Sequence, residues 1–108
     1  MPNVNEEGTW ASTVGSETTI VDKTANKSYD FYIDTTNLST GETLTLRLKI
    51  QIISTGGLIV KELPPVTETA TSKCWRFPWE SSPYHYRVTG QQAGGSTRNF
   101  DFILLDAT

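Results

Sequence analysis

The chain has 108 residues, of which 36% are hydrophobic and 19% charged, and its formal net charge is -3 at pH 7. This length fits one domain that can bury roughly two-thirds of its extended surface in a single core, without metal or disulfide support. The slightly acidic balance argues against binding nucleic acid through phosphate neutralisation, and no stretch approaches the roughly 20 apolar residues of a membrane-spanning helix.

The N-terminal segment, residues 1–8, is polar and acidic. We expect it to form a mobile arm, because chain ends stay loose unless packing holds them. The segment has neither the basic start nor the apolar stretch of a secretion signal. Cys74 is the only cysteine, so no internal disulfide can form. The sequence therefore predicts folding in a cytoplasm.

Alternating side chains predict the first four strands, at residues 9–14, 17–21, 29–34 and 43–53. The last of these is the clearest. Five aliphatic side chains share one of its faces, and polar side chains occupy the other. The aliphatic set is Leu44, Leu46, Leu48, Ile50 and Ile52. Such a strand packs against the core on one face and is exposed to solvent on the other.

The second half of the chain predicts two hairpins separated by a long loop. The first hairpin spans residues 43–63 around a glycine turn, and the second spans residues 84–105 around the turn at 91–97. The loop, residues 64–83, begins with two prolines and can hold one short edge strand near residues 72–77. With about seven strands, residues 1–108 are expected to form a single all-β domain, an antiparallel β-sandwich or a small barrel.

The sequence carries no convincing catalytic or metal signature. His85 has no second histidine, cysteine or paired carboxylates beside it to complete a zinc shell, and no local partner activates Cys74. A triad assembled from distant segments stays open. Four aspartates could converge on calcium, but solubilising charge on outward strand positions is the favoured interpretation. These four are Asp30, Asp34, Asp101 and Asp106. We expect no cofactor, no metal and no small-molecule substrate.

The segment Trp75-Arg-Phe-Pro-Trp79 is the best candidate for a binding site. Trp75, Arg76, Phe77 and Trp79 have the composition of an interface anchor, and they lie in a region that strand alternation does not bury. The competing interpretation is that the rings fold back and plug one end of the core. Residues 4–10, which include Val4 and Trp10, are a second candidate contact. Tyr84 and Tyr86 are expected in the core.

Several segments together resemble small β-rich virion proteins of tailed bacteriophages. They are Tyr29-Asp-Phe-Tyr-Ile-Asp-Thr-Thr-Asn-Leu38, Gly41-Glu-Thr-Leu-Thr-Leu-Arg-Leu48, Ser82-Pro-Tyr84 and Gln91-Gln-Ala-Gly-Gly-Ser-Thr-Arg-Asn-Phe-Asp-Phe102. The likeness covers residues 29–105 and includes capsid decoration, or cement, proteins. It implies a non-enzymatic protein of the virion, assembled in the host cytoplasm. Such a protein binds junctions of the major capsid protein, often as a dimer or trimer of itself.

Two other classes of function remain open. A carbohydrate-binding sandwich would use Trp75, Trp79 and an exposed tyrosine as a platform of coplanar rings. An enzyme would need His85 beside Cys74 or a serine. Within the virion class, a tail or neck component is the alternative to a head decoration protein.

Overall fold

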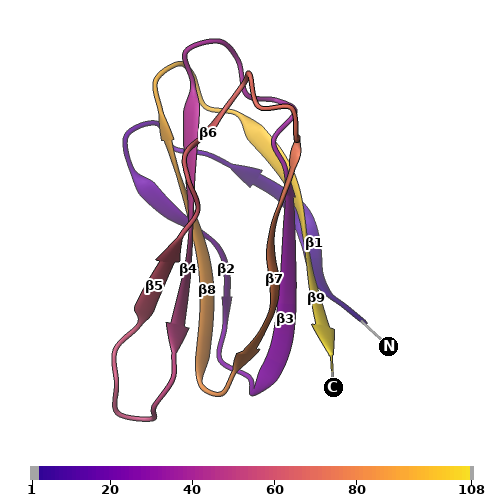
Figure 1. The fold of residues 1–108 in the computed structure, drawn as a ribbon, viewed down its shortest axis with the longest axis vertical. Coiled ribbons are helices and arrows are strands. Elements are labelled where there is room, and N and C mark those ends of the chain that lie inside the picture. Colours follow the sequence, from indigo (N-terminus) through magenta and orange to yellow (C-terminus); the bar gives the residue numbers. More distant parts are fainter. Residues whose placement is uncertain (1–2, 108) are drawn as a thin grey trace.

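Two antiparallel sheets face each other across one core in the computed structural model, which describes residues 3–107 (Figure 1). Sheet A contains, in spatial order, β1 (Asn3–Ala11), β9 (Asn99–Ala107), β3 (Lys27–Asp34) and β7 (Cys74–Ser82). Sheet B contains β2 (Glu17–Lys23), β8 (His85–Ala93), β4 (Thr43–Gln51) and β5 (Ile59–Glu62), and the short β6 (Val66–Thr67) also pairs with β4. The predicted all-β sandwich is confirmed.

The strand order is that of a jelly roll. The chain crosses between the sheets after every strand except along β4, β5 and β6, which stay in sheet B, so that β1-β9-β3-β7 faces β2-β8-β4-β5. This is the arrangement produced when two Greek keys fold over each other. It brings the first and last strands together: Asn3 pairs with Asp106, and both ends of the described chain lie on the same side of the molecule (Figure 1).

The core follows the period-two patterns of β3 and β4. Tyr29, Phe31 and Ile33 point inward from β3, and Leu44, Leu46 and Leu48 do so from β4. The alternation in residues 43–53 breaks down beyond β4, since Ile52 is 57% exposed. Between the sheets, Trp10 packs so closely on Gly90 that a Cβ there would lie 2.5 Å from the indole ring.

The predicted hairpin at residues 43–63 is confirmed by the pairing of β4 with β5, but the hairpin at 84–105 is wrong. β8 pairs with β2 and β4, whereas β9 pairs with β1 and β3, so the two strands lie in different sheets. The glycine-rich turn between them crosses from one sheet to the other. Strand alternation alone cannot distinguish such a crossing from a hairpin, because both join two amphipathic strands.

A buried carboxylate, Glu42, anchors this crossing. It accepts hydrogen bonds from the Arg98 side chain at 2.8–3.0 Å and from the backbone N–H groups of Ser39 and Ser96 at 2.8 and 3.2 Å. Gly95 has a φ of +71°, and a Cβ there would lie 2.1 Å from a Glu42 carboxylate oxygen. The segment Gly95-Ser-Thr-Arg-Asn-Phe100 therefore has a structural role: Gly95 makes room, Arg98 pairs with Glu42 and Phe100 fills the core.

Two segments predicted as irregular are strands. Residues 3–8 are not a mobile arm but most of β1, because the free edge of β9 offers them backbone partners. The region 64–83 is less of a loop than predicted: it contains β6 and the nine-residue β7, an edge strand that confirms and extends the short edge strand expected near residues 72–77. Pro78 fits into β7 because it lies at a bulge opposite Asp30 and because β7 is an edge strand.

Candidate interaction surfaces

The outer face of sheet A is a mixed apolar surface. Residues that pair across antiparallel strands lie on the same face as each other. Side chains alternate between the two faces along a strand, so the inward Tyr29 and Phe31 place Asp30 and Tyr32 on the outer face. Their neighbours on this side form what we call the sheet A face. It consists of Val4, Tyr32, Arg76, Trp79, Ile103 and Leu105, with Trp79 in the bulge at the β7 edge.

Arg76 is held in one orientation on the sheet A face. Its Nε and Nη2 donate to the two carboxylate oxygens of Asp30 at 2.9 and 2.8 Å, and its guanidinium carbon lies 5.1 Å from the centre of the Tyr32 ring. Asp30 is buried beneath this pair, whereas the Arg76 side chain is 42% exposed. The two-point contact fixes the planar guanidinium while its outer edge stays accessible.

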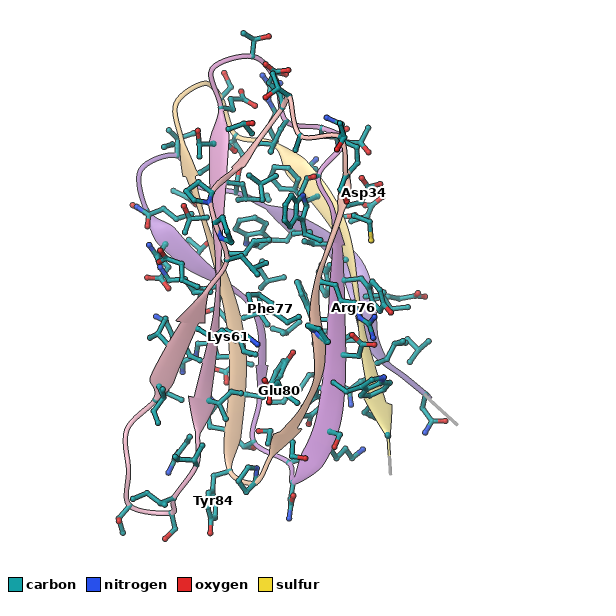
Figure 2. The ribbon with its side chains drawn as sticks, viewed as in Figure 1. Asp34, Lys61, Arg76, Phe77, Glu80 and Tyr84 are labelled. Atoms are coloured by element: carbon teal, nitrogen blue, oxygen red, sulfur yellow. The ribbon has the colours of Figure 1, made fainter. Side chains whose placement is uncertain are left out.

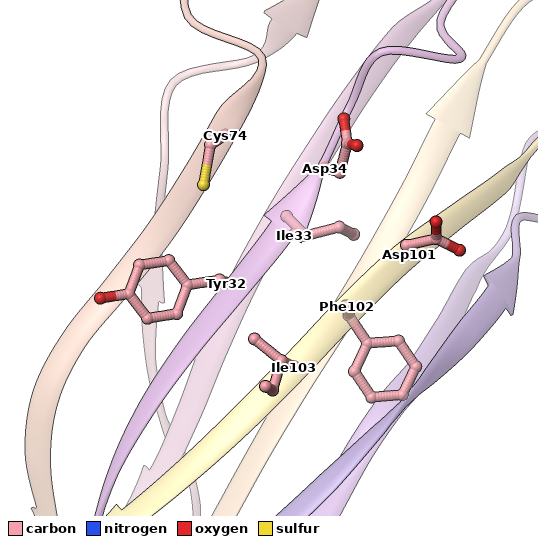
Figure 3. A pocket seen from close by; sticks show the side chains of 7 residues that line it. All are labelled: Tyr32, Ile33, Asp34, Cys74, Asp101, Phe102 and Ile103. Atoms are coloured by element: carbon pink, nitrogen blue, oxygen red, sulfur yellow. The ribbon is translucent and has the colours of Figure 1, made fainter. Parts of the chain in front are cut away.

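A shallow hollow of about 250 Å³ is lined on one side by Tyr32, the residue that stacks with Arg76 (Figure 3). Its lining residues come from β3, β7 and β9: Tyr32, Ile33, Asp34, Cys74, Asp101, Phe102 and Ile103. Asp34 accepts hydrogen bonds from the Thr36 hydroxyl and from the Thr36 backbone N–H, and these lower the pKa of Asp34. Asp101 accepts a hydrogen bond from the Thr9 hydroxyl. Within residues 3–107, no group of three or more His, Cys, Asp or Glu side chains could hold a metal ion. Asp30, Asp34, Asp101 and Asp106, the aspartates considered as calcium ligands, therefore form no such group among the described residues.

The two reactive side chains considered for catalysis lie on different sheets. Cys74 is exposed at the start of β7 in sheet A. His85 starts β8 in sheet B, where its Nε2 contacts the Asp22 carboxylate. The two therefore form no thiol and imidazole pair.

The outer face of sheet B carries charges that pair with one another. Glu17 bridges Arg47 at 3.4 Å and Lys49 at 2.8 Å, and Asp22 contacts Arg87 at 3.2 Å. Hydrogen bonds from Lys49 and Thr89 lower the pKa of Glu17. These mutually neutralised groups give the face a polar surface without a strong net charge.

A second apolar surface, which the sequence analysis did not identify as a site, lies at the end of the β4–β5 hairpin. We call it the hairpin surface. Its most exposed members are Ile52, Ile53, Ile59 and Val60, each between 52 and 58% exposed. The hairpin projects from one end of the sandwich, and Tyr84, which was expected in the core, is 43% exposed at the same end (Figures 1 and 2). The available signal was the doublet Ile52-Ile53: consecutive apolar residues on one strand cannot both face the core.

The six predicted contact residues divide into two groups. Val4, Arg76 and Trp79 share the sheet A face, with Val4 on the edge strand β1 and the other two on the opposite edge strand β7. The other three, Trp10, Trp75 and Phe77, pack into or against the core, which corrects their assignment as surface contacts. Figure 2 shows the difference between two neighbours on β7, with Phe77 between the sheets and Arg76 outside them. Inward and outward positions alternate along β7 because it is a strand.

Comparisons with protein families, curated proteins and solved structures find no match. Among residues 3–107 there is no helix long and apolar enough to cross a membrane.

Proposed function

We propose that this protein is a non-enzymatic structural component of a virion, specifically a head decoration protein that binds junctions of the major capsid protein and stabilises the shell. The observation that carries the proposal is the sheet A face, which presents Val4 on one edge strand, Arg76 and Trp79 on the other, and Ile103, Leu105 and Tyr32 between them. Exposed aromatic, aliphatic and arginine side chains are the composition of a protein interface. The resemblance of residues 29–105 to phage virion proteins supplies the biological setting.

The chemistry of this face suits an adhesive role. Asp30 and Tyr32 hold Arg76 before any partner arrives, so little side-chain freedom is lost when its exposed edge binds a carboxylate or backbone carbonyl. Trp79, which is 40% exposed, can bury the rest of its ring against a partner. On a shell with many equivalent sites, a modest contact repeated many times reinforces the whole lattice.

The carbohydrate-binding alternative has less support. It requires Trp75 and Trp79 to present coplanar rings, but Trp75 packs against the core while Trp79 is exposed. A tail or neck component would use the same sheet A face, and it differs from a decoration protein chiefly in copy number.

Mass spectrometry of purified virus particles from the source tests the proposed function. Copies on the order of hundreds per particle, as a repeated lattice contact requires, would support decoration. A handful of copies would instead place the protein in the tail or neck. Its absence from particles would refute the virion assignment.

A binding assay tests the surface. In particles that contain the protein, Trp79→Ala should weaken attachment by roughly tenfold or more, the effect of removing an interface anchor. The matched control is Thr19→Ala, because Thr19 is exposed on β2 in the other sheet. Equal attachment of both variants would show that Trp79 is not part of the contact.

A further inference from the structure

The hairpin surface and the strand beside it are unprotected. β5 is the last strand of its sheet and pairs with β4 on one side only, and all four of its residues are exposed. Natural edge strands usually carry charge or are covered, because free backbone groups next to apolar side chains invite another strand. Here Ile59 and Val60 occupy half of the strand, directly after the apolar hairpin end.

The charges on β5 are neutralised within the chain. Glu62 accepts a hydrogen bond from Arg47 Nε at 2.6 Å. The Lys61 ammonium lies 3.6 Å from a Glu80 carboxylate oxygen and points into the space between the sheets (Figure 2). Residues 52–60 contain no ionisable side chain. Both charged side chains of residues 52–62 are therefore paired within the chain. A second copy approaching this edge would meet no unpaired like charge from this segment.

We propose that two copies of this chain associate through β5, with the two strands antiparallel about a twofold axis. Sheet B would then continue from one copy into the other through β5, a strand-addition contact in which main-chain hydrogen bonds supply affinity. In a twofold antiparallel pairing the residue at the axis faces its own copy, so a pairing centred on Val60 places Val60 opposite Val60 of the second copy and Leu58 opposite its Glu62. The end of each hairpin would then cover the uncharged segment 63–65 of the other.

Two features limit the association to two copies: the prolines that follow β5 and the twofold symmetry of the contact. Pro64 and Pro65 follow β5 directly, so the pairing cannot extend beyond a few residues. An isologous contact uses the same edge on both copies, which leaves no free β5 to recruit a third. The inference is independent of the proposed function, since it concerns the isolated protein.

Sedimentation velocity of the full chain over a range of concentrations up to roughly 100 μM tests the proposal, since a dissociation constant of that size half-populates the dimer. We expect a species of twice the 12.0 kDa chain mass. Val60→Lys sets two ammonium groups close together at the axis and should raise the dissociation constant at least about tenfold. Val14→Lys, the same change at an exposed valine outside β5 and the hairpin, is the matched control and should leave association unchanged.

Two further measurements test the proposal even if Val60→Lys folds poorly. Ile53→Lys changes the hairpin surface beyond the end of β4 and should also weaken association. Hydrogen exchange of the β5 amides should slow as concentration rises, because those groups become paired in the dimer. A wild-type chain that stays monomeric throughout would overturn the proposal. So would a dimer whose stability is unchanged in Val60→Lys and Ile53→Lys.

Discussion

At the level of single residues, Glu42 is a buried carboxylate that accepts hydrogen bonds from Arg98, Ser39 and Ser96. Arg98 and the backbone N–H of Ser39 lower the Glu42 pKa to about 2, against an ordinary value of 4.5. A carboxyl whose pKa is depressed by folding stabilises the folded state above its unfolded pKa. This contribution is therefore complete above about pH 4.5 and is lost as the pH falls towards 2.

The first prediction concerns Glu42→Gln. The amide keeps the shape of the side chain but leaves the Arg98 guanidinium without its counter-charge, so the unfolding midpoint at pH 7 should fall by roughly 10 °C. The difference between wild type and variant should shrink as the pH is lowered from 4.5 to 2. Thermal unfolding followed by circular dichroism measures both effects. Glu7→Gln, at an exposed position of β1, is the control. A gap that stays constant across this pH range would contradict the assigned role.

At the scale of single elements, β1 is where structure and expectation differ most. Its polar sequence resembles a loose arm, but the strand pairs with β9 from Asn3 to Ala11. Asn5 donates a hydrogen bond to the buried Asp106 at 2.6 Å, which lowers the pKa of that carboxyl. Hydrogen bonding to β9 rather than hydrophobicity thus places the first half of β1.

The second prediction follows from that pairing. A chain that begins at Gly8 loses half of the β1 ladder and leaves Asp106 without Asn5. Each lost hydrogen bond contributes about 1 kcal/mol, so the free energy of unfolding should fall by at least about 2 kcal/mol. Urea denaturation measured by tryptophan fluorescence tests this. A mobile arm would instead leave the denaturation midpoint unchanged.

Period-two patterns predicted the elements better than they predicted their partners. The inward faces of β3 and β4 were readable because each carries three large apolar side chains at alternate positions. The partners of β8 and β9 were not, since both strands are amphipathic and only their pairing, β8 with β2 and β4 and β9 with β1 and β3, reveals that the chain changes sheet there. Strand pairing depends on contacts between residues far apart in sequence, which a local pattern does not contain.

The candidate site was predicted only in part, because its membership also depends on strand pairing between residues far apart in sequence. The cluster of aromatic side chains near Trp79 located the region, but only strand geometry separates Arg76 and Trp79 from the inward-facing Trp75 and Phe77. Val4 joins them through pairing with Leu105, which is 101 residues away in sequence. The hairpin surface was overlooked because its aliphatic residues fit the strand pattern until the sheet ended.

For the molecule as a whole, the jelly-roll topology should govern folding speed. β9 pairs with both β1 and β3, so sheet A cannot be completed until nearly the whole chain has been brought together. Proteins dominated by such distant pairings fold in milliseconds to seconds, because loop-closure entropy opposes the pairing before the contacts form.

A circular permutant provides the last prediction. Joining residue 107 to residue 3 through a short glycine linker and opening the chain between Thr71 and Ser72, in an exposed loop, makes β9 and β1 a local hairpin. The native contacts are retained, so stability should change little, while refolding should accelerate by roughly 3–10-fold. Stopped-flow fluorescence of Trp10 and Trp75, compared with the unjoined chain carrying the same linker, measures the rates. Unchanged refolding would mean that bringing β1 to β9 does not limit folding, and the slow step would then lie in closing sheet B around β4 and β8.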